Sequence, residues 1–80
     1  MKGTNETLMS VYHENTLLFC TDSFPVIPNE GEVISVRKVD ENDEAQSTRY
    51  IVIGREYIYQ KNEKTDSRDI FVIVRVREMK

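Results

Sequence analysis

The sequence has few of the residues on which catalytic and metal sites depend. Its 80 residues include one cysteine, one histidine and three glycines. Cys20 has no partner for an internal disulfide, and a zinc site needs more ligands than His13 and Cys20 can supply. The three glycines stand far apart, so there is no glycine-rich phosphate loop. These absences predict a protein without a metal or cofactor.

Long apolar runs are also absent. No run of 18 apolar residues occurs, so we expect no membrane-spanning segment. The first twelve residues, MKGTNETLMSVY, lack the apolar core of a secretory signal. Together with the single cysteine, this indicates a protein of the reducing cytoplasm.

Composition indicates one globular domain over residues 1–80, with 39% apolar and 31% charged residues. The net charge of −3 is unevenly spread. Residues 1–48 hold three basic and nine acidic side chains, and residues 49–80 hold eight basic and five acidic ones. Two interpretations remain open: separate acidic and basic faces, or two halves that neutralise each other across the fold.

Alternation of apolar and polar residues dominates, and no helical period extends over eleven residues. The pattern predicts five strands, at residues 7–12, 17–22, 32–39, 49–60 and 69–78. A charged loop at 40–48 and a polar loop at 61–68 would separate the last three. In the last strand one face is all apolar, and the other begins apolar and ends in arginines. The apolar face is Ile70, Val72, Val74 and Val76, and the other face is Phe71, Ile73, Arg75 and Arg77. We therefore predict an all-β fold, a five-stranded antiparallel small barrel or strongly curled sheet.

The strand at 49–60 contains Gly54 in its interior, which is typical of a β-bulge. A bulge near Gly54–Arg55 would reverse the alternation of side chains beyond it. The expected core face is Ile51, Ile53 and Ile58, and the expected partly exposed face is Tyr50, Val52, Tyr57 and Tyr59.

Both prolines lie in the segment FPVIPNEGE, residues 24–32. Pro25 and Pro28 lack an N–H donor and hold the preceding residues extended, so this segment cannot lie inside a sheet. We expect an arm that covers one end of the barrel with Phe24 and Ile27. The P-x-x-P pattern could also be a docking ligand, but its strand and acidic surroundings disfavour that interpretation.

The order of these motifs resembles small phage and prophage proteins with a barrel of the Src-homology-3-like kind. The resemblance rests on F-P-x-x-P-x-x-G-E-x-I, on Y-x-V-x-x-R-x-Y-x-Y and on a final I-x-V-x-V strand. Here these residues are Phe24, Pro25, Pro28, Gly31, Glu32 and Ile34; Tyr50, Val52, Arg55, Tyr57 and Tyr59; and Ile70, Val72 and Val74. The resemblance implies a bacterial or phage-infected cytoplasm and carries no assigned chemistry.

No pattern indicates catalysis. DENDEA begins like a calcium loop, but Ala45 replaces the required glycine and Ile51 the final glutamate. In the first hairpin, His13 and Cys20 would lie too far apart for a catalytic dyad. The carboxylates gather in exposed loops, whereas acid–base catalysis needs burial to separate their pKa values. We therefore expect a protein that is not an enzyme.

Two sets of residues suggest binding. Six tyrosines and arginines of the C-terminal half have the character of a protein interface: Tyr50, Arg55, Tyr57, Tyr59, Arg75 and Arg77. An acidic patch, Asp40, Glu41, Asp43 and Glu44, would suit a basic partner. The first prediction is a protein-binding module of phage type, for example an inhibitor of a host factor. The alternatives are a nucleic-acid-binding barrel using Tyr57, Tyr59, Arg75 and Arg77, and a component that self-associates through an unpaired edge strand.

Overall fold

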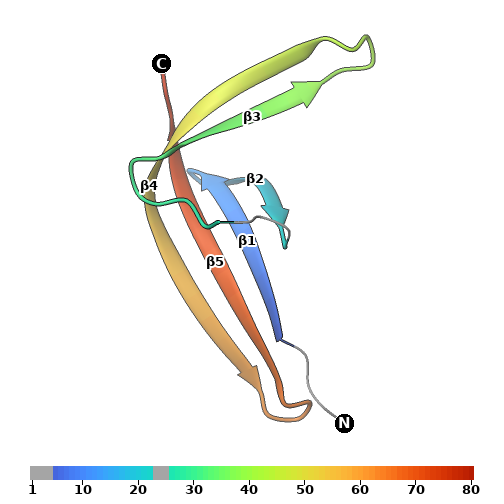
Figure 1. Cartoon of the computed structure of the whole chain (residues 1–80), viewed down its shortest axis with the longest axis vertical. Helices are drawn as coiled ribbons and strands as arrows, with labels where there is room; N and C mark the ends of the chain where they lie inside the picture. The colour runs from blue at the N-terminus through green and yellow to red at the C-terminus, as the bar shows by residue number, and fades with distance from the viewer. Residues whose placement is uncertain (1–4, 23–25) are drawn as a thin grey trace.

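The structure, a computed structural model, describes residues 5–22 and 26–80. It is all-β, as predicted, with one five-stranded sheet in the order β2-β1-β5-β4-β3 (Figure 1). The strands are β1 (Asn5–His13), β2 (Thr16–Thr21), β3 (Val33–Val39), β4 (Ala45–Asn62) and β5 (Ser67–Glu78). The described residues include no helix that is long and apolar enough to cross a membrane.

One of the strand pairs differs from the antiparallel expectation. β1 pairs with β2, β4 with β3 and β4 with β5 in the antiparallel sense, whereas β1 and β5 run parallel over the whole of β1. The β3–β4–β5 meander returns beside the first hairpin with β5 in the direction of β1. Alternation of side chains is the same for both pairings, so the sequence pattern contains no information on strand direction.

The sheet curls into a half-barrel and has two edges, β2 and β3. The Cα radius of gyration is 15.3 Å, against about 12 Å for a compact chain of this length. The accessible surface is 6500 Å², against about 5,000 Å² for a compact protein of 9.4 kDa. The molecule therefore exposes more surface than its mass requires.

The charged loop is shorter than predicted, because β4 begins at Ala45 instead of residue 49. The turn between β3 and β4 is limited to residues 40–44. The Oδ1 of Asp40 accepts hydrogen bonds from the N–H groups of Asn42 and Glu44, each at 2.9 Å. This closes a tight turn, so residues 45–48 pair with β3 and lengthen the hairpin beyond the rest of the sheet (Figure 1).

The core is small and lies on one face of the sheet, called here the core face. Its buried side chains are Met9, Val11, Tyr50, Val52, Val72, Val74 and Val76. The opposite, outer face begins on β5 with the half-buried Phe71 and Ile73. Val72, Val74 and Val76 of β5, on the face that is apolar throughout in the sequence, are buried.

The bulge in β4 is confirmed, with the register shift between Val52 and Gly54. The side chains of β4 also divide into the two predicted sets, but the set that was assigned to the core was the wrong one. Tyr50 and Val52 are 8% and 1% exposed, whereas Ile53 is 50% exposed and Ile58 38%. The reason is register: Val52 lies opposite Val76 on the buried face of β5, and Ile51 lies opposite Arg77.

The proline arm is described from Val26 onward, and its Phe24 and Pro25 lie outside the described residues. Ile27 is half-buried against the core, and Pro28 is buried. Gly31 ends the arm with a φ of 93°, a conformation that favours glycine, and its N–H donates to the carbonyl of Val52 at 2.8 Å. The arm therefore covers part of the core face before the chain enters β3.

Candidate interaction surfaces

The core face continues beyond the buried core at the end of the β4–β5 hairpin. Tyr57 lies opposite Val72, and Tyr59 lies opposite Ile70, so both tyrosines share the face of the buried valines. Yet Tyr57 is 54% exposed, Tyr59 62% and Ile70 38%. β2 pairs only with the second half of β1, so no described strand extends the sheet beyond β1 at this end. We call Tyr57, Tyr59 and Ile70 the tyrosine surface.

Arg55 connects this surface to the proline arm. Its Nη1 donates to the carbonyl oxygens of Pro28 at 3.3 Å and Ile27 at 3.5 Å. Its guanidinium carbon lies 5.7 Å from the ring centroid of Tyr57, within cation–π range. Of the six predicted interface residues, Arg55, Tyr57 and Tyr59 are thus brought together.

Tyr50, another of the six, lies within the core instead. Its ring centroid is 5.5 Å from that of His13, with the two planes tilted by 57°. Ile34 of β3 is its cross-strand neighbour. Because it is 8% exposed and its ring packs against His13, Tyr50 offers little surface to a partner.

Arg75 and Arg77 complete the predicted set but lie on the outer face, alternating with the buried Val74 and Val76. Arg75 forms an ion pair with Glu56 at 4.0 Å, and both side chains are more than half exposed. The two arginines therefore lie on the opposite side of the sheet from Tyr57 and Tyr59. A single strand of nucleic acid lying along one face would not meet all four side chains.

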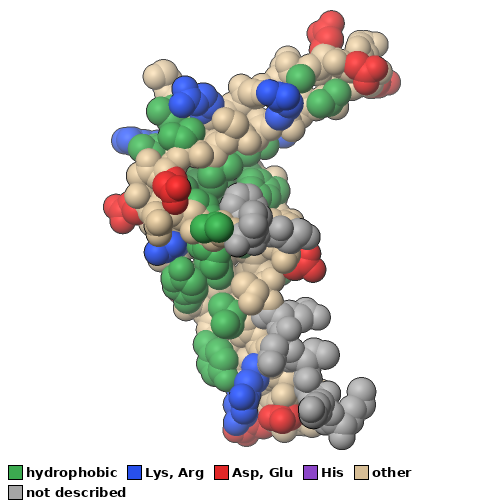
Figure 2. Space-filling model, in the orientation of Figure 1, with side chains coloured by type: hydrophobic (Ala, Val, Ile, Leu, Met, Phe, Trp, Pro, Cys, Tyr) green, Lys and Arg blue, Asp and Glu red, His purple; other side chains and the backbone are tan. Residues whose placement is uncertain are grey.

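The acidic patch is the tip of the extended β3–β4 hairpin, where the acidic side chains gather away from the body of the molecule (Figure 2). All four members, Asp40, Glu41, Asp43 and Glu44, are exposed. Asp40 differs from the others because its carboxylate closes the turn. Asp43 has a φ of 61°, a conformation that Asp and Asn tolerate better than most residues.

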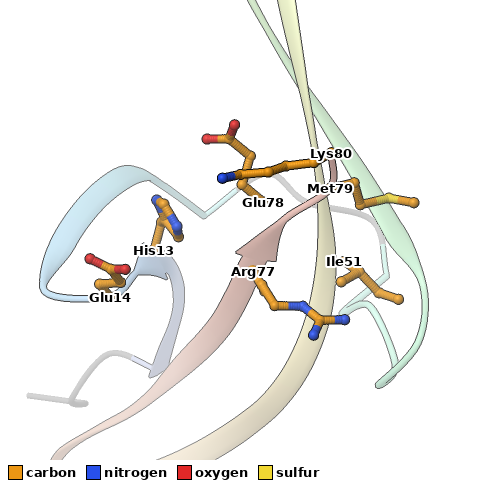
Figure 3. A pocket seen from close by; sticks show the side chains of 7 residues that line it. All are labelled: His13, Glu14, Ile51, Arg77, Glu78, Met79 and Lys80. Carbon is orange, nitrogen blue, oxygen red and sulfur yellow. The ribbon is translucent and has the colours of Figure 1, made fainter.

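An open cleft of about 640 Å³ lies where the first hairpin meets the end of β5 (Figure 3). It is lined by His13, Glu14, Ile51, Arg77, Glu78, Met79 and Lys80. Glu78 and Lys80 extend from the end of the chain toward the side on which His13 lies. No serine, threonine or cysteine is among these residues, and Cys20 lies in β2 opposite Ser10. The described lining of the cleft is thus mainly charged.

The outer face carries exposed apolar side chains that the alternating pattern did not identify. Ile53 and Ile58 were expected in the core but are exposed there, and Leu17 of β2 is 47% exposed. No group of three or more His, Cys, Asp or Glu residues in the described ranges is placed to hold a metal ion.

Comparison with known proteins identifies no relative: no family model, curated protein or solved structure matches the chain. The function must therefore be inferred from the surfaces of the molecule itself. Among them, the tyrosine surface combines large exposed side chains with direct continuity to the core.

Proposed function

We propose that this chain is a non-catalytic module that binds another protein through the tyrosine surface. The observation that carries the proposal is that Tyr57, Tyr59 and Ile70 lie in register with the buried valines and yet remain exposed. Side chains on a core face are normally covered, because their burial provides the main favourable free energy of folding. A partner seated here would extend the core of the half-barrel.

The chemistry of this surface suits a protein. Tyrosine and arginine are enriched at the centres of protein interfaces, where a rigid ring buries a large area at a small entropic cost. Arg55 is held between two carbonyl oxygens and the Tyr57 ring, so part of the surface is ordered before binding. The molecule exposes about 1,500 Å² more than a compact protein of its mass, an excess that is spread over the open sheet and its extended hairpin.

The more specific form of the proposal is an inhibitor of a host factor, made by a phage or prophage and acting in the bacterial cytoplasm. The extended acidic tip supports this form, because a basic partner would be attracted to the carboxylates of Glu41, Asp43 and Glu44. These three are free to contact a partner without opening the turn, which depends on Asp40.

Capture from bacterial lysate with matched variants tests the proposal. Tyr59→Ser should abolish recovery of a partner that the parent chain retains, whereas Ile58→Ser should leave recovery unchanged. The two positions are adjacent but point to opposite faces, so general loss of surface apolarity affects both equally. Retained capture by Tyr59→Ser and lost capture by Ile58→Ser would place the partner on the outer face and contradict the proposal.

The same assay separates the other candidates. Neutralising the tip with Glu41→Gln, Asp43→Asn and Glu44→Gln should weaken capture at low salt if a basic partner contacts it. Titration with labelled single-stranded DNA and RNA at two salt concentrations tests nucleic acid as the partner. Tight binding that declines steeply with salt, and is lost on Arg75→Ala as well as Tyr59→Ser, would replace the protein-binding proposal.

A further inference from the structure

β3 is an edge strand of the described sheet, so one side of its backbone has no partner strand among residues 5–22 and 26–80. The groups on that side follow from the hydrogen bonds at the two ends of β3. The N–H of Val52 donates to the carbonyl of Glu32 at 2.8 Å, and the N–H of Asp40 donates to that of Glu44 at 3.0 Å. Bonded positions alternate along an antiparallel pair, so the even-numbered residues of β3 bond to β4. The backbone groups of Val33, Ser35 and Arg37 therefore point away from β4, toward the open edge of the sheet.

β3 is longer and more regularly paired than the other edge strand, and it carries Arg37 and Lys38, whereas β2 carries no charged side chain. The second edge, β2, has six residues, and its pairing with β1 is interrupted by a register shift. β3 has seven residues, Val33–Val39, with no proline and no shift in its pairing with β4. A regular edge strand of this kind is a template for another strand.

We propose that β3 pairs with β3 of a second copy of this chain, antiparallel and centred on Ser35, to form a symmetric dimer. In this register Ser35 faces Ser35 of the second copy, and Val33 faces Arg37. The backbone groups that pair are those at the odd positions, which β4 leaves unused. A two-fold axis makes each contact occur twice, as expected of a closed isologous interface.

Charge favours this register over the one centred on Val36. With Ser35 at the centre, Ile34 lies opposite Val36 of the second copy, and Glu32 lies opposite Lys38. Glu32 immediately precedes β3, and its Oε1 also accepts a hydrogen bond from the N–H of Asn29 at 2.5 Å. A pairing centred on Val36 would instead set Glu32 opposite Asp40 and Lys38 opposite Ile34. Directly opposed unlike charges stabilise an antiparallel pair and like charges destabilise it. The half-buried Ile34 and Val36 already lie against the core, so the dimer would extend one apolar face across both copies.

Amide hydrogen exchange at low and high protein concentration tests the dimer directly, alongside sedimentation equilibrium. The amides of Ile34 and Val36 should be protected at both concentrations, because β4 holds them. The amides of Val33, Ser35 and Arg37 should become protected only as the dimer forms. A chain that stays monomeric at high concentration, or a dimer in which these odd-numbered amides exchange freely, would overturn the proposal.

Matched charge variants test the register. Lys38→Glu should weaken dimerisation roughly tenfold (about 1.4 kcal/mol), because two attractive pairs become repulsive. Arg37→Glu makes the same change of charge at the next residue, which faces Val33, and should have a clearly smaller effect. Adding Glu32→Lys to Lys38→Glu should restore the dimer.

Equal effects of Lys38→Glu and Arg37→Glu on dimerisation would contradict the register. If Glu32→Lys impairs folding, the hydrogen-exchange pattern still shows whether β3 is the edge that pairs. None of these changes touches the tyrosine surface, so the two proposals are tested separately.

Discussion

At the scale of the residue, the structure gives different roles to side chains that the sequence grouped together. Tyr50 is packed against His13 in the core, whereas Tyr57 and Tyr59 of the same strand are mostly exposed. Arg55 holds the proline arm, whereas Arg75 is limited to an exposed ion pair. Each role depends on which residues of the neighbouring strand or of the proline arm lie next to the side chain.

Arg55→Ala should lower the free energy of unfolding by about 1 kcal/mol, because it removes hydrogen bonds to the carbonyls of Ile27 and Pro28. Arg75→Ala is the matched control: its exposed pair with Glu56 is worth little, so stability should change by less than about 0.5 kcal/mol. Urea denaturation followed by circular dichroism measures both. If the two variants lose the same stability, Arg55 does not hold the arm.

At the scale of the element, β4 shows how one extra residue organises a long strand. β4 pairs with β3 from Ala45 to Ile51 and with β5 from Tyr50 onward, so only Tyr50 and Ile51 pair with both strands, and beyond the bulge β4 pairs with β5 alone. The shift between Val52 and Gly54 keeps Tyr50, Val52, Tyr57 and Tyr59 on the core face across a strand of 18 residues. The bulge therefore joins the buried core to the exposed tyrosine surface.

Val52→Ala should destabilise the fold by about 2 kcal/mol, because it leaves a cavity where a side chain is 1% exposed. Ile53→Ala, at the next residue, should cost under about 1 kcal/mol, because that side chain is already half in water. Thermal unfolding of the two variants distinguishes the faces. A greater loss for Ile53→Ala would mean that the isoleucines, and not Val52, form the core.

At the scale of the whole molecule, the half-barrel buries less of its chain than a compact domain would. An unfolded chain of this mass exposes about 13,600 Å², so folding to 6500 Å² removes roughly half of that surface. The buried residues include no leucine, isoleucine or phenylalanine among the described part of the chain. Both proposed contacts, at the tyrosine surface and at the β3 edge, would add to this small buried area.

The smaller area buried on folding should lower the slope with which the free energy of unfolding falls as urea is added. The m-value scales with the surface exposed on unfolding, so the monomer should have an m-value about a sixth lower than a compact domain of 80 residues. Denaturation at a protein concentration low enough to exclude dimers, with a compact β-domain of equal length as reference, provides the comparison. An m-value equal to that of the reference would show that the chain closes on itself in solution.

The sequence by itself determined the elements of this protein. Alternation of apolar residues located all five strands, the interior Gly54 marked the bulge, and the prolines predicted a segment outside the sheet that the structure confirms at Ile27 and Pro28. These features depend on the local chemistry of the backbone and on the period of the side chains, which any stretch of sequence contains. The acidic patch was likewise expected in an exposed loop, and its four residues lie in the exposed turn between β3 and β4.

Only the tertiary structure decided which face is the core, which strands are parallel and which binding residues lie together. Ile51 and Val52 satisfy the same alternating pattern. Only their partners on β5, Arg77 and Val76, decide which face of β4 is exposed to solvent and which is buried. The parallel pairing of β1 with β5, the separation of Arg75 and Arg77 from the tyrosines, and the open edge of β3 are decided in the same way. Register joins residues far apart in the chain, and a pattern confined to one strand contains nothing about the strand beside it.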